Sequence, residues 1–158
     1  MDTVTSPDTP SDLDAEATPS AIAAARALAR LTRHLERSLT EASLTLPQYR
    51  LLSFLSTQPD AAHRLASKLN VRPPSLTALV DGLESRGLVA RVADTDDRRR
   101  VRIVITDEGR SHLDVADLVA ARRLAHIADL EAGGEQRLEG LESWHTALDE
   151  ALRLRIER

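Results

Sequence analysis

The chain has 158 residues, of which 42% are hydrophobic, 2% are aromatic and none is cysteine, and its net charge is −4. This length predicts one domain of ordinary size, with an aliphatic core. The lack of cysteine excludes disulfides, thiolate metal sites and thiol redox switches. No apolar run approaches the ~20 residues of a membrane span. The acidic N-terminus, with no basic residue before Arg26, does not resemble a signal peptide. We therefore expect a cytoplasmic protein without a membrane partner.

The charge is distributed unevenly along the chain. Residues 1–18 carry five acidic residues and no basic one, among prolines, serines and threonines, and this composition predicts a disordered acidic tail. Residues 61–105 carry nine basic residues against five acidic ones, whereas residues 106–158 carry seven against twelve. The positive excess is therefore concentrated in the middle of the chain. A local excess of this kind, rather than the total charge, steers association with an anionic polymer such as DNA.

Two helices are predicted before this basic segment. The first has a stripe of apolar residues at helical spacing, namely Ile22, Ala25, Leu28, Leu31, Leu35 and Leu39. The second begins at Thr45-Leu46-Pro47-Gln48, where threonine can cap the helix, proline suits the first turn and glutamine completes a capping box. It provides a scaffold for the segment that follows.

Two short helices with a tight break follow, which is the pattern of a helix-turn-helix. Residues 63–69 form the first helix, and Asn70, which tolerates the left-handed conformation, can end it. The next helix begins at about Pro73 or Pro74, because proline is tolerated in a first turn. Its buried stripe consists of Leu76, Leu79, Val80 and Leu83, and Gly87 ends it. This second helix would be the reader in a major groove.

A β-hairpin is predicted next, with strands at residues 88–92 and 101–105. Its tip carries Arg98, Arg99 and Arg100. A hairpin tip is narrow enough to enter a minor groove, whose negative potential attracts guanidinium groups. A solvated, charged loop is the alternative interpretation of these three residues. Together with the preceding helices, the hairpin predicts a winged helix-turn-helix.

Two helices complete the chain. Thr106 caps a long helix, Gly133-Gly134 interrupts the pattern, and the last helix carries Leu138, Leu141, Trp144, Leu148 and Leu152. One small winged helix cannot bury all the terminal apolar stripes, so we expect a second copy to cover them; packing within one chain is the alternative. The predicted fold is mainly α with a small β-wing: a tail at 1–18, a helical dimerisation region at 19–43 and 107–158, and a winged helix-turn-helix DNA-binding lobe at 44–106.

These motifs resemble the MarR family of transcriptional regulators over roughly residues 20 to 156. The wing signature stands as Asp97-Arg98-Arg99, then alternating apolar residues, then Thr106-Asp107-Glu108-Gly109, and the helix-end phrase at residues 83–89 is also similar. The resemblance implies a homodimer whose terminal helices form the interface. It also implies a ligand-responsive repressor that binds a palindromic operator, an inverted repeat in double-stranded DNA, with no cofactor.

The expected DNA contacts follow from this arrangement. Ser75 and Thr77 can reach base edges or phosphates, and the resemblance makes Arg99 the minor-groove arginine with Asp97 as its brace. Ala78 stands where many members of the family carry an arginine. The full set of expected DNA-binding residues is Arg64, Lys68, Arg72, Pro74, Ser75, Thr77, Ala78, Arg91, Asp97, Arg98, Arg99 and Arg100.

Other functions are less well supported by the residues. The resemblance implies a small anionic or aromatic effector, for which the candidate residues are Arg30, His34, Arg37 and Arg50; salt bridges are the alternative role for them. The histidines show no zinc spacing. The acids at 94, 96 and 97 lie on a hairpin tip that cannot exclude water, and no nucleophile–base pair accompanies them, so we expect no enzyme. A winged-helix dimer that binds proteins and no operator is the alternative function.

Overall fold

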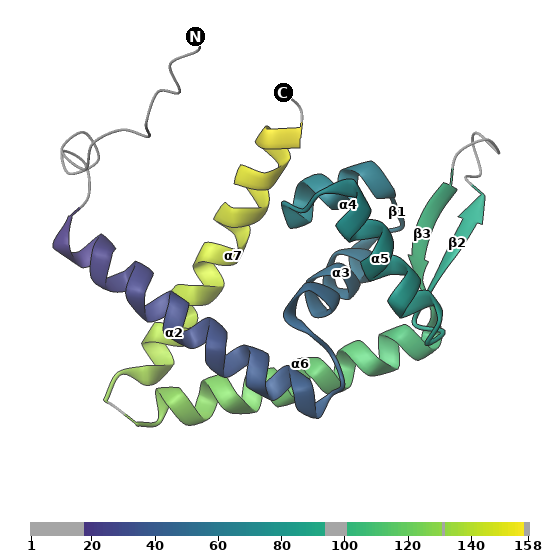
Figure 1. Ribbon diagram of the computed structural model, residues 1–158. Coiled ribbons are helices and arrows are strands. Elements are labelled where there is room, and N and C mark those ends of the chain that lie inside the picture. The colour runs from purple at the N-terminus through teal and green to yellow at the C-terminus, as the bar shows by residue number, and fades with distance from the viewer. Residues whose placement is uncertain (1–17, 94–100, 131, 157–158) are drawn as a thin grey trace, which may run out of the picture. The chain divides into compact units, whose positions relative to one another are not determined.

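A computed structural model describes residues 18–93, 101–130 and 132–156. The expected class, mainly helical with a small sheet, is confirmed (Figure 1). The elements are α2 (Pro19–Glu41), α3 (Leu46–Thr57), β1 (Asp60–Ala61), α4 (Ala62–Leu69), α5 (Pro73–Glu84), β2 (Val89–Ala93), β3 (Val101–Ile105), α6 (Asp107–Ala128) and α7 (Gly134–Ile156). None of the described helices combines the length and the hydropathy needed to cross a membrane.

Local signals set the helix ends in the helix-turn-helix. The capping box at α3 is formed, with Thr45 accepting from the Gln48 N–H and the Gln48 side chain accepting from the Thr45 N–H. Asn70 ends α4 in the left-handed conformation, with φ of 55°. Pro73 opens α5, where its missing N–H costs nothing. The three predicted helix limits are therefore confirmed.

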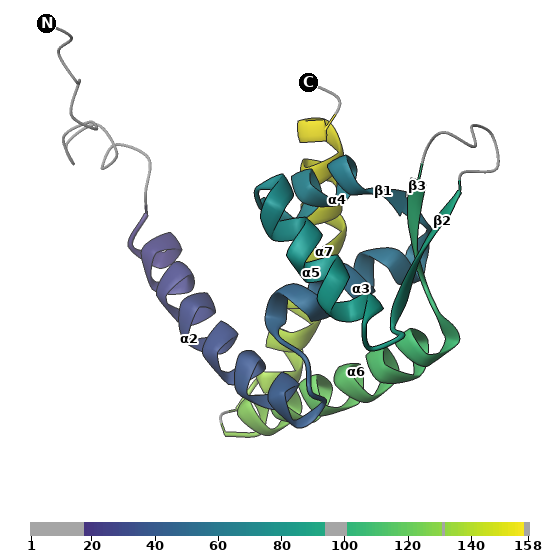
Figure 2. The ribbon, with the colours of Figure 1, turned by 45° about the vertical axis from the view of Figure 1, so that its right-hand side comes forward.

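The sheet has the strand order β1-β3-β2, with both pairs antiparallel. Strand β3 has the predicted limits, but β2 begins at Val89 rather than Leu88. The reason is that the Leu88 N–H donates to the Leu83 carbonyl and closes the end of α5, aided by Gly87 at φ of +71°. Strand β1, which pairs Asp60 with Ile103, was not predicted, because two residues are too short to show alternation. Figure 2 shows β2 and β3 side by side next to α5.

The core lies between α3, α4, α5, the sheet and α6, and it is aliphatic as predicted. Its largest fully buried side chains are Leu39, Leu44, Leu51, Leu52, Leu55, Leu65, Leu76, Leu83, Leu88, Val80 and Val89. Leu113 and Ala116 of α6 join the same cluster, so α6 is packed onto the helix-turn-helix. This packing fixes how α5 and the hairpin are held, because both contribute to one continuous core.

The chain forms two compact units, residues 1–34 and 35–158. In the first unit, Ile22 and Leu28 of α2 are exposed by 42% and 44%. In the second unit, large apolar side chains of α6, of α7 and of the turn between them also remain exposed, namely Val115, Leu118, Leu130, Leu141, Trp144 and Leu148. Large apolar side chains left exposed on two helices are candidates for a surface that a partner covers.

Candidate nucleic-acid interface

Helix α5 has one buried face and one exposed face. Leu76, Val80 and Leu83 are buried against the core. The expected reading residues lie on the other side: Arg72, Pro74, Ser75, Thr77 and Ala78 are all exposed. The first turn of α5 therefore presents short side chains, which let a helix approach base edges closely.

Two of these positions have specific local geometry. Arg72 is the N-cap of α5 in an extended conformation, and its side chain makes no capping hydrogen bond. The Thr77 hydroxyl donates to the Pro73 carbonyl at 3.1 Å. The Thr77 oxygen keeps its capacity to accept a hydrogen bond, while its proton is already engaged. Thr77 therefore fits a donor on the nucleic acid, such as an amino group of a base.

Arg64 and Lys68 of α4 both bind Asp60. The Lys68 Nζ lies 2.9 Å from Asp60 Oδ2, and the Arg64 guanidinium donates to Oδ1 of the same carboxylate. The Ala61 N–H also donates to that carboxylate at 2.8 Å, and Lys68 lies over the Phe54 ring at 5.7 Å from its centroid. Both expected phosphate contacts are thus held by one buried acid.

The ionisation of Asp60 follows from these contacts. Burial by itself raises the pKa of Asp60. The hydrogen bonds from Lys68, Arg64 and the Ala61 N–H act in the opposite direction and outweigh it, so the pKa of Asp60 lies below its ordinary value. The carboxylate is therefore charged at neutral pH, and it neutralises part of the positive charge that the sequence assigns to α4.

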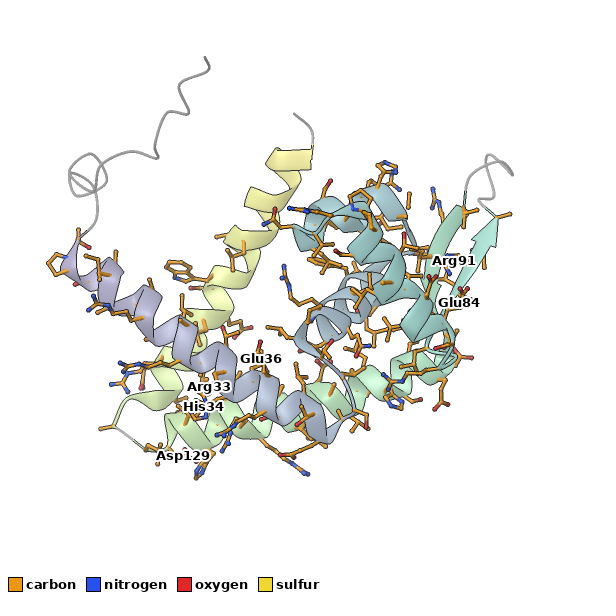
Figure 3. All side chains as sticks on the ribbon, in the orientation of Figure 1. Arg33, His34, Glu36, Glu84, Arg91 and Asp129 are labelled. Atoms are coloured by element: carbon orange, nitrogen blue, oxygen red, sulfur yellow. The ribbon has the colours of Figure 1, made fainter. Side chains whose placement is uncertain are left out.

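Arg91 of β2 is held by two acids of α5. Its Nη2 lies 2.6 Å from Asp81 Oδ1, its Nη1 donates to Glu84 Oε2, and its backbone N–H donates to Glu84 Oε1 at 3.1 Å. Figure 3 shows the labelled Glu84 and Arg91 beside each other, at the place where α5 and β2 come together. A third expected phosphate contact is therefore engaged within the protein.

The remaining expected DNA contacts lie between β2 and β3 in the sequence. Ala93 pairs with Val101, so the chain leaves and re-enters the hairpin at one end of the strand ladder. The four expected contacts in between, Asp97, Arg98, Arg99 and Arg100, lie outside the described residues.

The four candidate effector residues fall in two units. Arg30 and His34 belong to the first unit, and Arg37 and Arg50 to the second. Three of them follow each other along α2, and Arg50 lies on α3. Among the residues that the structure describes, no group of three His, Cys, Asp or Glu side chains is arranged to hold a metal ion.

The acids that bind the cations were not identified from the sequence as site residues. Asp60 precedes Arg64 by four residues, a spacing that could have indicated this ion pair, whereas Lys68 lies eight residues after Asp60, where spacing indicates no contact. Asp81 and Glu84 lie ten and seven residues before Arg91, across a turn, where spacing carries no such signal. Pattern analysis could therefore have found the Asp60–Arg64 pair, but not the contact of Lys68 with Asp60 or the cluster around Arg91.

Known proteins resemble this chain in sequence. A sequence model of the MarR family matches residues 44–101. The HTH-type transcriptional regulator TtmR of Methylorubrum extorquens (strain PA1) is 36% identical over 104 residues, which cover 65% of this chain and 52% of TtmR. The chain spans about half the length of several curated relatives that it matches.

Solved structures share the fold. The transcriptional repressor CouR bound to a 23-mer DNA duplex matches with a TM-score of 0.67 and 27% identity, over 90% of this chain and 99% of that one. CouR from Rhodococcus jostii RHA1 bound to p-coumaroyl-CoA matches with a TM-score of 0.61 and 26% identity, over 75% and 86% of the two chains.

Proposed function

Since the chain belongs to the MarR family, we propose that it is a sequence-specific DNA-binding transcriptional regulator. It binds a palindromic operator as a homodimer and acts as a ligand-responsive repressor. In this proposal each α5 lies in a major groove and each wing lies along the neighbouring minor groove, with two half-sites about one helical turn apart. A protein with this role works in the cytoplasm, where the bacterial chromosome lies.

The two-faced character of α5 is the observation that carries the proposal. One side is locked into the core through Leu76, Val80 and Leu83, and the other side is exposed and small at the end where the helix begins. A reading helix needs this combination, because its position must be rigid while its outer side chains remain available to the bases. The match to CouR with a DNA duplex supports DNA, rather than a protein, as the partner.

The homodimer is supported by the exposed apolar side chains of α6 and α7. Trp144 is 61% exposed and Leu148 is 56% exposed, and both lie on α7. Obligate interfaces between identical subunits are large and apolar, and a two-fold dimer doubles every DNA contact. A homodimer fits these exposed apolar residues better than an isolated chain does, since a monomer would leave their side chains in water.

The effector is proposed to be a small anionic or aromatic molecule. The three arginines Arg30, Arg37 and Arg50, together with His34, are the residues proposed to receive it. CouR, whose fold is similar, binds p-coumaroyl-CoA, a molecule that is both anionic and aromatic. The identity of the molecule is best sought through the genes beside the operator, because a repressor of this kind controls genes related to its ligand.

The experiment has two steps. The protein is first used to select bound fragments from its source genome, and a palindrome shared by the fragments gives the operator. Binding to that duplex is then titrated with salt, and log K should fall linearly with log[salt], with a slope of about −0.9 for each phosphate contact. A flat salt response, or no enriched palindrome, would contradict the proposal.

A separate variant tests the assignment of Arg99 to the minor groove. Arg99→Ala should weaken operator binding and leave the dimer folded, because the resemblance places this arginine in the minor groove. Circular dichroism and sedimentation are the controls for fold and assembly. An unchanged affinity would refute the assignment of Arg99 and would leave the role of α5 standing.

A further inference from the structure

Arg91 joins the wing to the reading helix through Asp81 and Glu84, and we call these three residues the wing clamp. We propose that Arg91 is a positioning residue, which fixes the hairpin relative to α5, and that it is not a phosphate contact. This inference rests on the proposed function, and it replaces the role that the sequence suggested for Arg91.

The first argument is the way in which Arg91 is engaged. Glu84 is the last residue of α5. Its two carboxylate oxygens accept hydrogen bonds from the backbone N–H and from the guanidinium of Arg91. Asp81 lies one turn earlier on α5 and receives the other terminal nitrogen at 2.6 Å. Both arms of the guanidinium fork are therefore occupied by carboxylates, the partners that its geometry suits best.

The second argument is the charge of the clamp. Two acids and one arginine give the wing clamp a net charge of −1. A phosphate that took Arg91 would leave Asp81 and Glu84 unpaired beside the negatively charged backbone of DNA. Like charges so placed repel, so contact with phosphate would cost more than it contributes.

The third argument is what the clamp fixes. Arg91 is the third residue of β2 and pairs with Ile103 of β3, whose side chain is buried in the core. The clamp therefore ties α5 to the middle of the hairpin, in addition to the turn that joins α5 to β2. A helix in one groove and a wing in the next must be correctly spaced to bind together, and preorganised spacing lowers the entropic cost of binding.

The test separates the two roles by the salt dependence of operator binding. In Arg91→Gln we expect the affinity to fall roughly three- to tenfold, at the lower end of the coupling between contacting residues. The slope of log K against log[salt] should stay that of the parent protein. Loss of a phosphate contact would instead make this slope less negative by about 0.9. Arg72→Gln, at the exposed N-cap of α5, is the matched variant in which we expect that change.

A second set of variants tests the acids. If Arg91 bound phosphate, Glu84→Gln would free it and strengthen operator binding. As part of a clamp, Glu84→Gln should weaken binding, and the double variant with Arg91→Gln should be no weaker than Arg91→Gln alone. Asp114→Asn, which removes an exposed acid of α6, measures the general effect of one charge on affinity. Tighter binding by Glu84→Gln than by Asp114→Asn would overturn the proposal.

The conservative variant Arg91→Lys also distinguishes a positioning role of Arg91 from a phosphate contact. A lysine can still reach a phosphate, but it cannot engage two carboxylates with a planar fork. We expect Arg91→Lys to lose affinity nearly as far as Arg91→Gln, again without a change in slope. Recovery of parental binding by lysine would indicate a phosphate contact.

A readout without DNA keeps the clamp testable if the proposed function fails. Amide hydrogen exchange should be faster across β2 in Glu84→Gln than in the parent, while the exchange of α3 stays unchanged. Faster exchange in a protein that binds no operator would support the clamp and contradict the function. Unchanged exchange across β2 would overturn the clamp itself.

Discussion

Lys68 Nζ lies 2.9 Å from Oδ2 of Asp60, a carboxylate whose side chain is only 3% exposed. The arginine one turn earlier on α4 binds the other oxygen of the same carboxylate. The start of the helix-turn-helix is therefore anchored by an acid between two cations, and these cations brace α4 against β1. Only the N–H groups of Lys68 and Arg64 that do not bind Asp60 remain available to contact phosphate.

Asp60→Asn should destabilise the protein by about 1–3 kcal/mol. The variant removes the charge that two cations share while keeping the shape of the side chain, and the cations are partly exposed, so water offsets part of the loss. Urea unfolding followed by circular dichroism measures this difference. Asp114→Asn, at an exposed position of α6, is the control and should leave the midpoint nearly unchanged.

The contribution of Asp60 should disappear in acid. Its pKa in the folded state lies below the ordinary value of 3.8, so its contribution is fully present above that value and is lost as the pH falls through the lower folded pKa. The difference in unfolding free energy between the parent and Asp60→Asn should therefore be constant from neutral pH down to about 5 and shrink below about 4. A difference that grows on acidification would contradict this assignment.

Tyr49 joins α3 to α6 through a hydrogen bond from its hydroxyl to Asp117 Oδ1 at 2.7 Å. Burial raises the pKa of Tyr49 above its ordinary value of 10.0, and the hydrogen bond and charge of Asp117 raise it further. Tyr49 is the only tyrosine, so an absorbance titration reports this group alone. We expect no tyrosinate near pH 10, and earlier ionisation in Asp117→Asn; a normal titration in the parent would contradict the contact.

Gly109 has no room for a side chain. A Cβ at this position of α6 would overlap the Leu88 carbonyl oxygen and lie 2.8 Å from Ile105 Cγ1. Gly109→Ala should therefore destabilise the protein by about 1–3 kcal/mol or more, because backbone rather than a flexible side chain must move. Gly82→Ala on α5 meets nothing within 4 Å and should instead stabilise by about 0.5–1 kcal/mol. Thermal unfolding of the two variants should shift in opposite directions.

Trp144→Glu should dissociate the proposed homodimer, because it places a charge on an apolar side chain that we propose lies in the interface. Sedimentation velocity at micromolar concentration measures the mass. Gln136→Glu, at an exposed polar position of the same helix, adds the same charge and should leave the dimer intact. Trp144 is the only tryptophan, so its emission should also shift to the red in the parent protein on dilution. An unchanged mass in Trp144→Glu would remove α7 from the interface.

Several elements were predictable from the sequence because the interactions that form them are local. The capping box at Thr45, the left-handed Asn70 and the proline at the start of α5 each act within about four residues, so the order of residues already contains both partners. The β-branched run at Val101–Ile105 is equally local, and it predicted β3 with its correct limits. The overall winged helix-turn-helix followed from these signals.

The tertiary structure decided the contacts between residues that are far apart in the sequence, which local patterns cannot predict. The pairing of β1 with β3 joins residues about forty positions apart, and Asp60 is buried where the two strands pair. The wing clamp likewise forms because the chain turns back at Gly87 and brings Arg91 to the acids of α5. A count of charges treats every arginine as available, but a charge in a fold is available only when no nearer partner of opposite sign already holds it.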